Sequence, residues 1–173
     1  PFINLGLDDH NAHVQPNGAY HYHASPRGLV SSLGPNQQQM LLIGYAADGF
    51  PIYTGYGHVD VNRTNSPLKK MRSSYRLKSG ARPAQPGGNY DGKFTEDYTY
   101  VPGAGDLDEC NGRFGPTPQF PQGSYHYYLT DDFPYIPRML RGKPDPSFQK
   151  TGPRPGRLRP PPARLQPAAD AAP

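Results

Sequence analysis

The sequence predicts a mainly β protein: a single compact domain of short strands and loops over residues 1–142, carrying two related YHY(H/Y) hairpin motifs, and then an extended Pro-rich C-terminal tail over residues 143–173. Three observations favour this class. The 20 Gly and 23 Pro interrupt any helical period along the 173 residues. The apolar content rests on 13 Tyr and 7 Phe, which favour strands. A YHY motif occurs twice.

The first predicted hairpin covers residues 10–23, HNAHVQPNGAYHYH, and holds four of the six histidines of the chain. Side chains alternate between the two faces of a strand, so His21 and His23 project from one face, about 6.6 Å apart along the strand. That spacing lets the two imidazoles converge on one ion.

The length of the turn decides whether His13 joins them. A two-residue turn at 17–18 pairs His13 with Tyr22 and puts it on the opposite face. A three-residue loop at 16–18 pairs His13 with His21, on the same face. The order Pro, Asn, Gly suits a three-residue type I turn with a bulge, because the Gly adopts the left-handed conformation. We therefore expect a histidine cluster.

The next predicted element is a hairpin over residues 40–53. An apolar run at 40–45 is followed by Asp48-Gly49, a two-residue turn signal, and by a returning strand at 50–53. Pro51 cannot donate to a ladder, which indicates an edge or a bulge position for this strand.

Two later segments are less regular. Residues 68–80, LKKMRSSYRLKSG, fit a short amphipathic helix or a strand, and the pattern leaves both open. Residues 91–103 alternate Phe and Tyr with polar residues and predict a strand.

The second YHY copy belongs to an internal duplication of residues 7–23 in residues 107–128. Both copies share the order LD, a variable residue, His or Cys, Asn, a small residue, a Pro-x-Gly turn and YHY. Five more residues precede the turn of the second copy. Two copies are too few for a solenoid, so we expect one domain with two similar halves.

The tail carries the basic charge of the chain. Residues 1–140 hold 11 Lys and Arg against 12 Asp and Glu, whereas residues 141–173 hold 7 against 2. A Pro/Arg-rich segment of this kind favours extended polyproline-like conformations. It is either a solvated basic tail or an arm that packs on a neighbouring copy. Aromatic residues do not interleave with its arginines, so we expect no nucleic-acid partner.

Several imidazoles together favour Cu or Zn over ions that prefer carboxylates. The predicted ligands are His13, His21 and His23, with His10 and His126 as further candidates. Asp8 or Asp9 are also near enough in sequence to complete a site. A structural ladder of polar residues and a pH-sensing patch remain alternative interpretations of the same histidines.

A second, weaker candidate is a calcium site formed by Asp106, Asp108 and Asn111. The Gly falls one position late for an EF-hand loop and no Glu follows at the required distance, so a capped turn is the alternative. Cys110 has no cysteine partner in the chain, and we expect a buried structural thiol.

Other function classes lack their motifs. The sequence contains no P-loop, no GxSxG and no dinucleotide-binding fingerprint, and no apolar run approaches the length of a membrane span. No catalytic set emerges, which favours a binding protein over an enzyme.

Five segments together resemble the YHYH-protein family: GAYHYHASP, IGYAADGFPIYTGYG, MRSSYRLKSGARP, GGNYDGKFTEDYTYVPGAGDLDECNGRFGPTP and GSYHYYLTDDFPYIPR. The resemblance covers roughly residues 5–142 and implies an exported protein, periplasmic or secreted, without implying a chemistry. Members of that family tend to have Cys in the first LDxCNG-like copy, where this chain has His10. A disulfide between the two copies, which this pattern suggests, therefore cannot form in this chain. His10 is instead a candidate metal ligand.

Three functions follow as hypotheses. The first is an extracytoplasmic protein that binds Cu or Zn through the histidine cluster. The second is a structural subunit of a homopolymeric assembly, in which residues 143–173 pack on the next copy. The third is a metal-dependent hydrolase with Asp108 or Glu109 as the base.

Overall fold

The computed structural model describes residues 6–34 and 38–148. Within these ranges it contains ten short strands, one α-helix and two 3-10 turns, which confirms the mainly β class. The elements are β1 Ala12–Val14, β2 Tyr20–Tyr22, α1 Arg27–Leu33, β3 Leu42–Tyr45, β4 Pro51–Tyr53, β5 Tyr56–His58, β6 Leu68–Lys70, β7 Tyr75–Leu77, η1 Thr95–Asp97, β8 Tyr98–Tyr100, β9 Gly112–Gly115, β10 Ser124–Tyr128 and η2 Pro146–Phe148.

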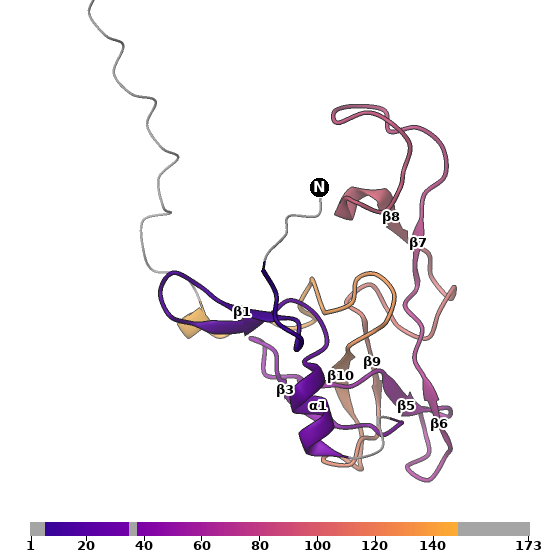
Figure 1. Ribbon diagram of the computed structural model, residues 1–173. Coiled ribbons are helices and arrows are strands. Elements are labelled where there is room, and N and C mark those ends of the chain that lie inside the picture. The colour runs from indigo at the N-terminus through magenta and orange to yellow at the C-terminus, as the bar shows by residue number, and fades with distance from the viewer. Residues whose placement is uncertain (1–5, 35–37, 149–173) are drawn as a thin grey trace, which may run out of the picture.

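The strands form one four-stranded sheet and three two-stranded ribbons. The larger sheet has the order β3-β4-β10-β9, and the ribbons are β1-β2, β5-β6 and β7-β8. The β1-β2 ribbon projects to one side of the four-stranded sheet, and the β7-β8 ribbon extends away from it on the other side (Figure 1). The two YHY hairpins therefore belong to different sheets.

The hairpin predicted over residues 40–53 is present as β3 and β4, but two of its details differ. Ala46 N–H donates to the Phe50 carbonyl and Gly49 has φ +83°, so the loop has three residues rather than two. The expectation of an edge strand is wrong, because β4 also pairs in parallel with β10. Pro51 is tolerated because it is the first residue of β4, and the bulge lies on the opposite strand, between Leu42 and Gly44.

The two irregular segments resolve into strands. Residues 68–80 contain β6 and β7 and no helix, and residues 91–103 contain η1 followed by β8. Asp97 ends η1 fully buried, and Arg82 donates to its two carboxylate oxygens, each at 2.7 Å. This pairing with Arg82 holds the pKa of Asp97 well below its usual range. The ion pair joins the loop of the β7-β8 ribbon to its base.

The core occupies both faces of the four-stranded sheet. Tyr53 and Tyr128 pair across β4 and β10 and lie on one face, in a cluster with two methionines and Leu107. The other face packs Tyr127 with Tyr125 and Cys110. Cys110 is buried, as predicted, and burial raises the pKa of its thiol. Tyrosine thus supplies most of the volume that Leu or Ile fills in other domains.

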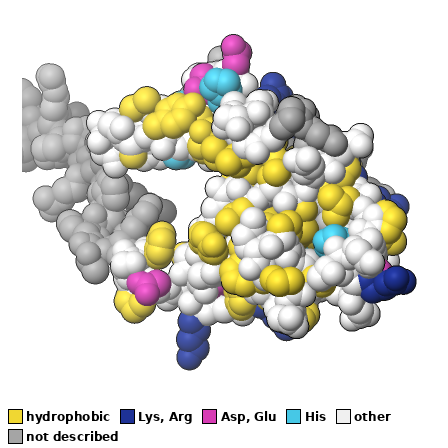
Figure 2. Space-filling model, turned by 90° about the horizontal axis from the view of Figure 1, so that it is seen from below, with side chains coloured by type: hydrophobic (Ala, Val, Ile, Leu, Met, Phe, Trp, Pro, Cys, Tyr) yellow, Lys and Arg dark blue, Asp and Glu magenta, His cyan; other side chains and the backbone are white. Residues whose placement is uncertain are grey.

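Hydrophobic side chains also reach the surface in many places, and they occupy much of the face shown in Figure 2, with charged side chains toward its periphery. The predicted tail, residues 143–173, falls mostly outside the described residues, which end at 148. Its first part is attached to the β3-β4 loop, because Asp145 N–H donates to the Ala47 carbonyl.

Candidate metal centre

The loop between β1 and β2 has the three-residue geometry that the sequence predicts. Gln15 N–H donates to the Ala19 carbonyl and Gly18 N–H to the Gln15 carbonyl, both at 2.8 Å, and Gly18 has φ +83°. In the resulting register His13 lies opposite His21, which confirms the predicted pairing. The local turn chemistry therefore places a third histidine on the face of His21 and His23.

These three side chains, here called the histidine cluster, converge. One ligand atom from each of His13, His21 and His23 lies within 4.8 Å of the others. The Nε2 atoms of His13 and His23 are 3.1 Å apart, and the three ring centroids are separated by 4.6 to 4.8 Å. Among the described residues, this is the group of three metal-ligating side chains whose ligand atoms lie close to one another.

The spacing fits a first-row transition metal. Ligand nitrogens about 2.0–2.1 Å from zinc are about 3.3 Å apart in a tetrahedron, and a square arrangement around copper places them about 2.9 Å apart. The 3.1 Å between His13 and His23 lies between these values.

The surroundings of His21 also favour a ligand. Its Nδ1 is buried without a hydrogen-bond partner, which is costly for a ring nitrogen in the absence of an ion or water. Its Nε2 lies 3.3 Å from the side-chain Nε2 of Gln15. Sequence analysis missed Gln15. Gln15 follows directly after β1 and lies two residues after His13, so the alternation of side chains along a strand is the signal that points to it.

His23 favours the neutral imidazole, the form that binds metals. The pKa of His23 is lowered, first by desolvation and then by the neighbouring His21 and His13. His23 therefore loses its proton readily, and its lone pair becomes available to a metal ion.

The second copy of the motif has the same backbone and serves as an internal comparison. Asp8 Oδ1 accepts the N–H groups of His10 and Ala12, at 2.8 and 3.0 Å. Asp108 Oδ1 accepts those of Cys110 and Gly112, both at 3.0 Å.

The similarity continues through both hairpins. Asn11 and Asn111 have φ +63° and +61°. The first tyrosine of each YHY donates its hydroxyl to the Asp of the same copy. In the second copy Arg113 lies opposite His126, as His13 lies opposite His21 in the first. The duplication seen in the sequence is therefore a structural repeat.

The chemistry of the second copy is different. Arg113, His126 and Tyr128 occupy the positions of His13, His21 and His23. His126 is fully buried, with Nδ1 2.9 Å from the Ser124 carbonyl and Nε2 2.7 Å from the Tyr128 hydroxyl. Burial lowers its pKa to about 4. Both ring nitrogens have protein partners, so the structure does not bring His126 into the cluster.

His10 also lies outside the cluster. Its side chain is exposed and its ring lies against Gly28, where an added Cβ would approach Nδ1 to 2.7 Å. The ring packs over the start of α1 instead of facing β2.

The candidate calcium residues are engaged in the fold. Asp106 pairs with Lys69 at 2.6 Å and accepts the N–H of Arg72. Asp108 accepts two backbone N–H groups and the Tyr125 hydroxyl. Asn111 is buried and donates to the Tyr128 carbonyl, although its Oδ1 has no hydrogen-bond partner. This arrangement fits the capped-turn alternative, since each carboxylate has an internal role.

The carboxylates named for the hydrolase hypothesis are not close to a metal-binding group. Asp108 holds the turn before β9, and Glu109 lies 3.8 Å from Arg141 at the surface. Neither belongs to the group of side chains that contains the histidine cluster.

The model of a known family matches residues 1–142 of the chain, and its description is YHYH protein. The chain belongs to the YHYH protein family. Residues 20–23 of the chain read YHYH and include His21 and His23 of the cluster. No curated protein and no solved structure matches the chain. Within residues 6–34 and 38–148, no helix is long and apolar enough to cross a membrane.

Proposed function

We propose that this YHYH protein binds one Cu or Zn ion through His13, His21 and His23. The observation that carries the proposal is the convergence of three imidazoles on one hairpin, with their ligand atoms within 4.8 Å. The internal repeat strengthens it, since a hairpin of the same register is built elsewhere without this cluster. The hairpin fold therefore does not itself require histidine at these positions.

The cluster supplies three nitrogen ligands, which leaves at least one coordination position for water or another donor. Gln15 is a candidate for this donor, because its amide already contacts His21. The amide oxygen and nitrogen exchange places by a simple rotation, so either can face the ion.

We further propose that the protein acts outside the cytoplasm, as the resemblance to exported YHYH proteins implies. A site of three exposed or half-buried imidazoles suits that setting, because it needs no reducing environment, unlike a thiolate site.

The first test is a titration of tag-free, EDTA-treated protein with Zn²⁺ and Cu²⁺ at pH 7.5, followed by calorimetry. We expect one ion per chain. Replacing His21 and His23 together by Ala removes two of three ligands and should lower the affinity by at least about 100-fold. His10→Ala is the matched control, because it removes a histidine of the same segment outside the cluster.

The proposal fails if neither ion binds, or if the double variant binds as the parent chain does. Loss of binding in His10→Ala alone would move the site away from the cluster. Circular dichroism of each variant confirms that the fold is retained.

A pH series extends the test. Bound metal competes with protons for the same nitrogens, so affinity should fall as pH drops below about 6.5, with up to three protons taken up per ion released. An affinity that is constant from pH 7.5 to 5 would exclude imidazole ligands.

A further inference from the structure

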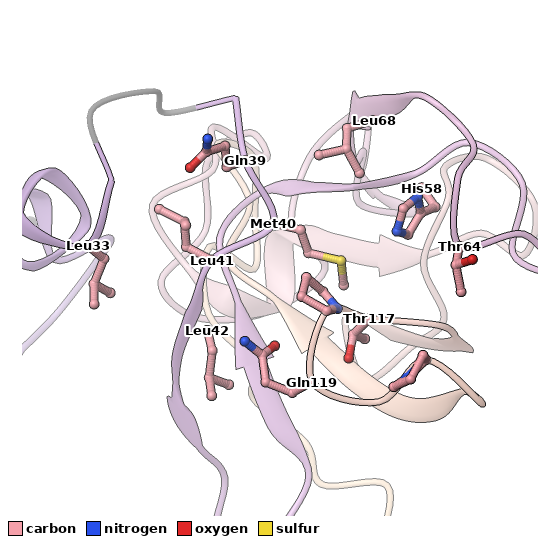
Figure 3. Close-up of a pocket in the computed structure, with 12 residues that line it drawn as sticks. Leu33, Gln39, Met40, Leu41, Leu42, His58, Thr64, Leu68, Thr117 and Gln119 are labelled. Atoms are coloured by element: carbon pink, nitrogen blue, oxygen red, sulfur yellow. The ribbon is translucent and has the colours of Figure 1, made fainter.

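A cavity of about 820 Å³ lies beside the start of β3, at the end of the strand remote from the β3-β4 loop. None of the residues that line it belongs to the metal site. Its walls come from the end of α1, the start of β3, the β5-β6 ribbon and the loop between β9 and β10 (Figure 3). The volume is within the range of small-molecule sites, about 300–1,000 Å³.

The lining is mostly aliphatic. Met40, a buried core residue, forms part of it, and Leu68 on β6 covers one side with 37% of its surface exposed. None of the twelve lining side chains belongs to Asp, Glu, Lys or Arg. An ionic ligand would lose its hydration here without gaining a partner, so the lining favours an uncharged one.

A few polar groups have fixed orientations. The Tyr53 hydroxyl donates its single proton to Gln119 Oε1 at 2.8 Å and lies 2.9 Å from the Thr117 hydroxyl, whose proton it accepts. Thr117 Oγ1 also accepts the N–H of Phe120, so this hydroxyl is held by two protein partners. The Gln119 amide oxygen accepts the Tyr53 proton, which leaves the NH₂ group of the same amide as a donor.

His58 supplies a hydrogen-bond acceptor to the same cavity. Its Nδ1 lies 2.9 Å from the Ser66 carbonyl and donates to it, which leaves Nε2 of the neutral ring as an acceptor. The side chain stands on the same cavity wall as Leu68 (Figure 3). The cavity therefore combines an apolar body with one acceptor, His58 Nε2, and one donor, the Gln119 NH₂ group.

We propose that this cavity binds an uncharged, largely apolar small molecule that carries a hydroxyl or N–H group for His58 Nε2. The Arg-rich tail of the chain does not suit it, because the lining offers no acidic side chain. The proposal stands apart from the metal site and does not depend on it.

The probe is N-phenyl-1-naphthylamine, a neutral aromatic molecule with one N–H whose fluorescence rises in apolar surroundings. We expect saturable binding of one molecule per chain. The matched comparison is 8-anilinonaphthalene-1-sulfonate, which has the same rings and a sulfonate. The anion should bind at least about tenfold more weakly, because no cation in the lining replaces its hydration.

Two variants locate the site. Leu68→Trp puts a larger side chain over the cavity and should weaken binding of the neutral probe by about tenfold or more. Leu77→Trp on β7 is the control, since Leu77 is also an exposed leucine of a three-residue strand and lies outside the cavity. It should bind the probe like the parent chain.

Equal effects of the two Trp variants, equal binding of the neutral and anionic probes, or no saturable binding would each overturn the proposal. The chain has no Trp, so the introduced residue also reports by its own emission that each variant is folded.

Discussion

His21 and His126 occupy equivalent positions in two copies of one motif and have different environments. His21 is half-buried in a cluster of imidazoles, with one ring nitrogen lacking a hydrogen-bond partner. His126 is fully buried, with both nitrogens bonded to protein atoms. The neighbours differ: β10 of the second hairpin also pairs with β4 in a four-stranded sheet, whereas in the described residues β2 pairs with β1 alone.

The buried His126 should make the protein sensitive to acid. Its pKa of about 4 lies below the ordinary value near 6.5, so the unfolded chain takes up the proton first as pH falls. The stabilisation is complete above about pH 6.5 and is lost between about pH 6.5 and pH 4. The expected loss is about 3 kcal/mol. Urea denaturation in EDTA from pH 7.5 to 4.5 measures it.

His126→Gln is the variant for this measurement, because an amide keeps one donor and one acceptor without titrating. Between pH 6.5 and 4.5 the free energy of unfolding of this variant should fall less than that of the parent chain. The difference between the two losses should be most of the expected value of about 3 kcal/mol. An identical pH dependence would show that other groups, such as carboxylates, determine the acid response.

At the scale of elements, the chain uses one turn device twice. In each copy an Asp caps the turn that precedes the first strand and is fixed by a Tyr hydroxyl from the second strand. An Asn in the left-handed conformation follows in both copies. Asn tolerates this conformation better than other residues with a side chain, which explains its presence at both positions.

Removing each Asp should have a different consequence. Asp8→Ala releases the turn that precedes β1, and we expect about tenfold weaker zinc binding with unchanged stoichiometry, since the ligands remain but are held less firmly. Asp108→Ala leaves partly buried N–H groups without an acceptor and should lower the free energy of unfolding by about 1–3 kcal/mol, with zinc affinity retained.

Calorimetry and urea denaturation of both variants separate the two roles. If Asp108→Ala weakens zinc binding as much as Asp8→Ala does, the first hairpin is not an independent support for the site.

At the scale of the whole molecule, small sheets surround a core made largely of tyrosine. Tyr53, Tyr127 and Tyr128 are fully buried, and Tyr53 and Tyr127 donate their hydroxyls to other side chains. Buried phenols need such partners, so the polar contacts of this core are as specific as its packing. Two-stranded ribbons alone are marginal, and their stability depends on the four-stranded sheet.

The proposal that residues 143–173 pack on a neighbouring copy is tested by truncation. Because Asp145 is bonded to the β3-β4 loop, the chain should be cut after residue 148. If the protein is a metal-binding module, residues 1–148 will keep the oligomeric state and the zinc stoichiometry of the full chain. Light scattering after size-exclusion chromatography measures the oligomeric state. A large assembly that dissociates on truncation would favour the structural-subunit hypothesis.

The sequence by itself determined the β class, the repeat and the pairing of His13 with His21. These features depend on residues that are close together in the sequence: the alternation of side chains in a strand, a Pro-Asn-Gly loop and a turn capped by Asp. It also indicated that Cys110 is buried, because the chain offers no second cysteine and no motif of a reactive thiol.

Only the tertiary structure decided what each YHY does. Of the edge or bulge position predicted for β4, the edge alternative was wrong. His126 did not join the cluster for the same reason: β4 pairs with β10, more than 70 residues later in the chain. That pairing buries the second YHY and leaves the first YHY outside the sheet. Local sequence sets the register of a hairpin, but contacts between distant segments set its burial, and burial decides whether a histidine is a core residue or an available ligand.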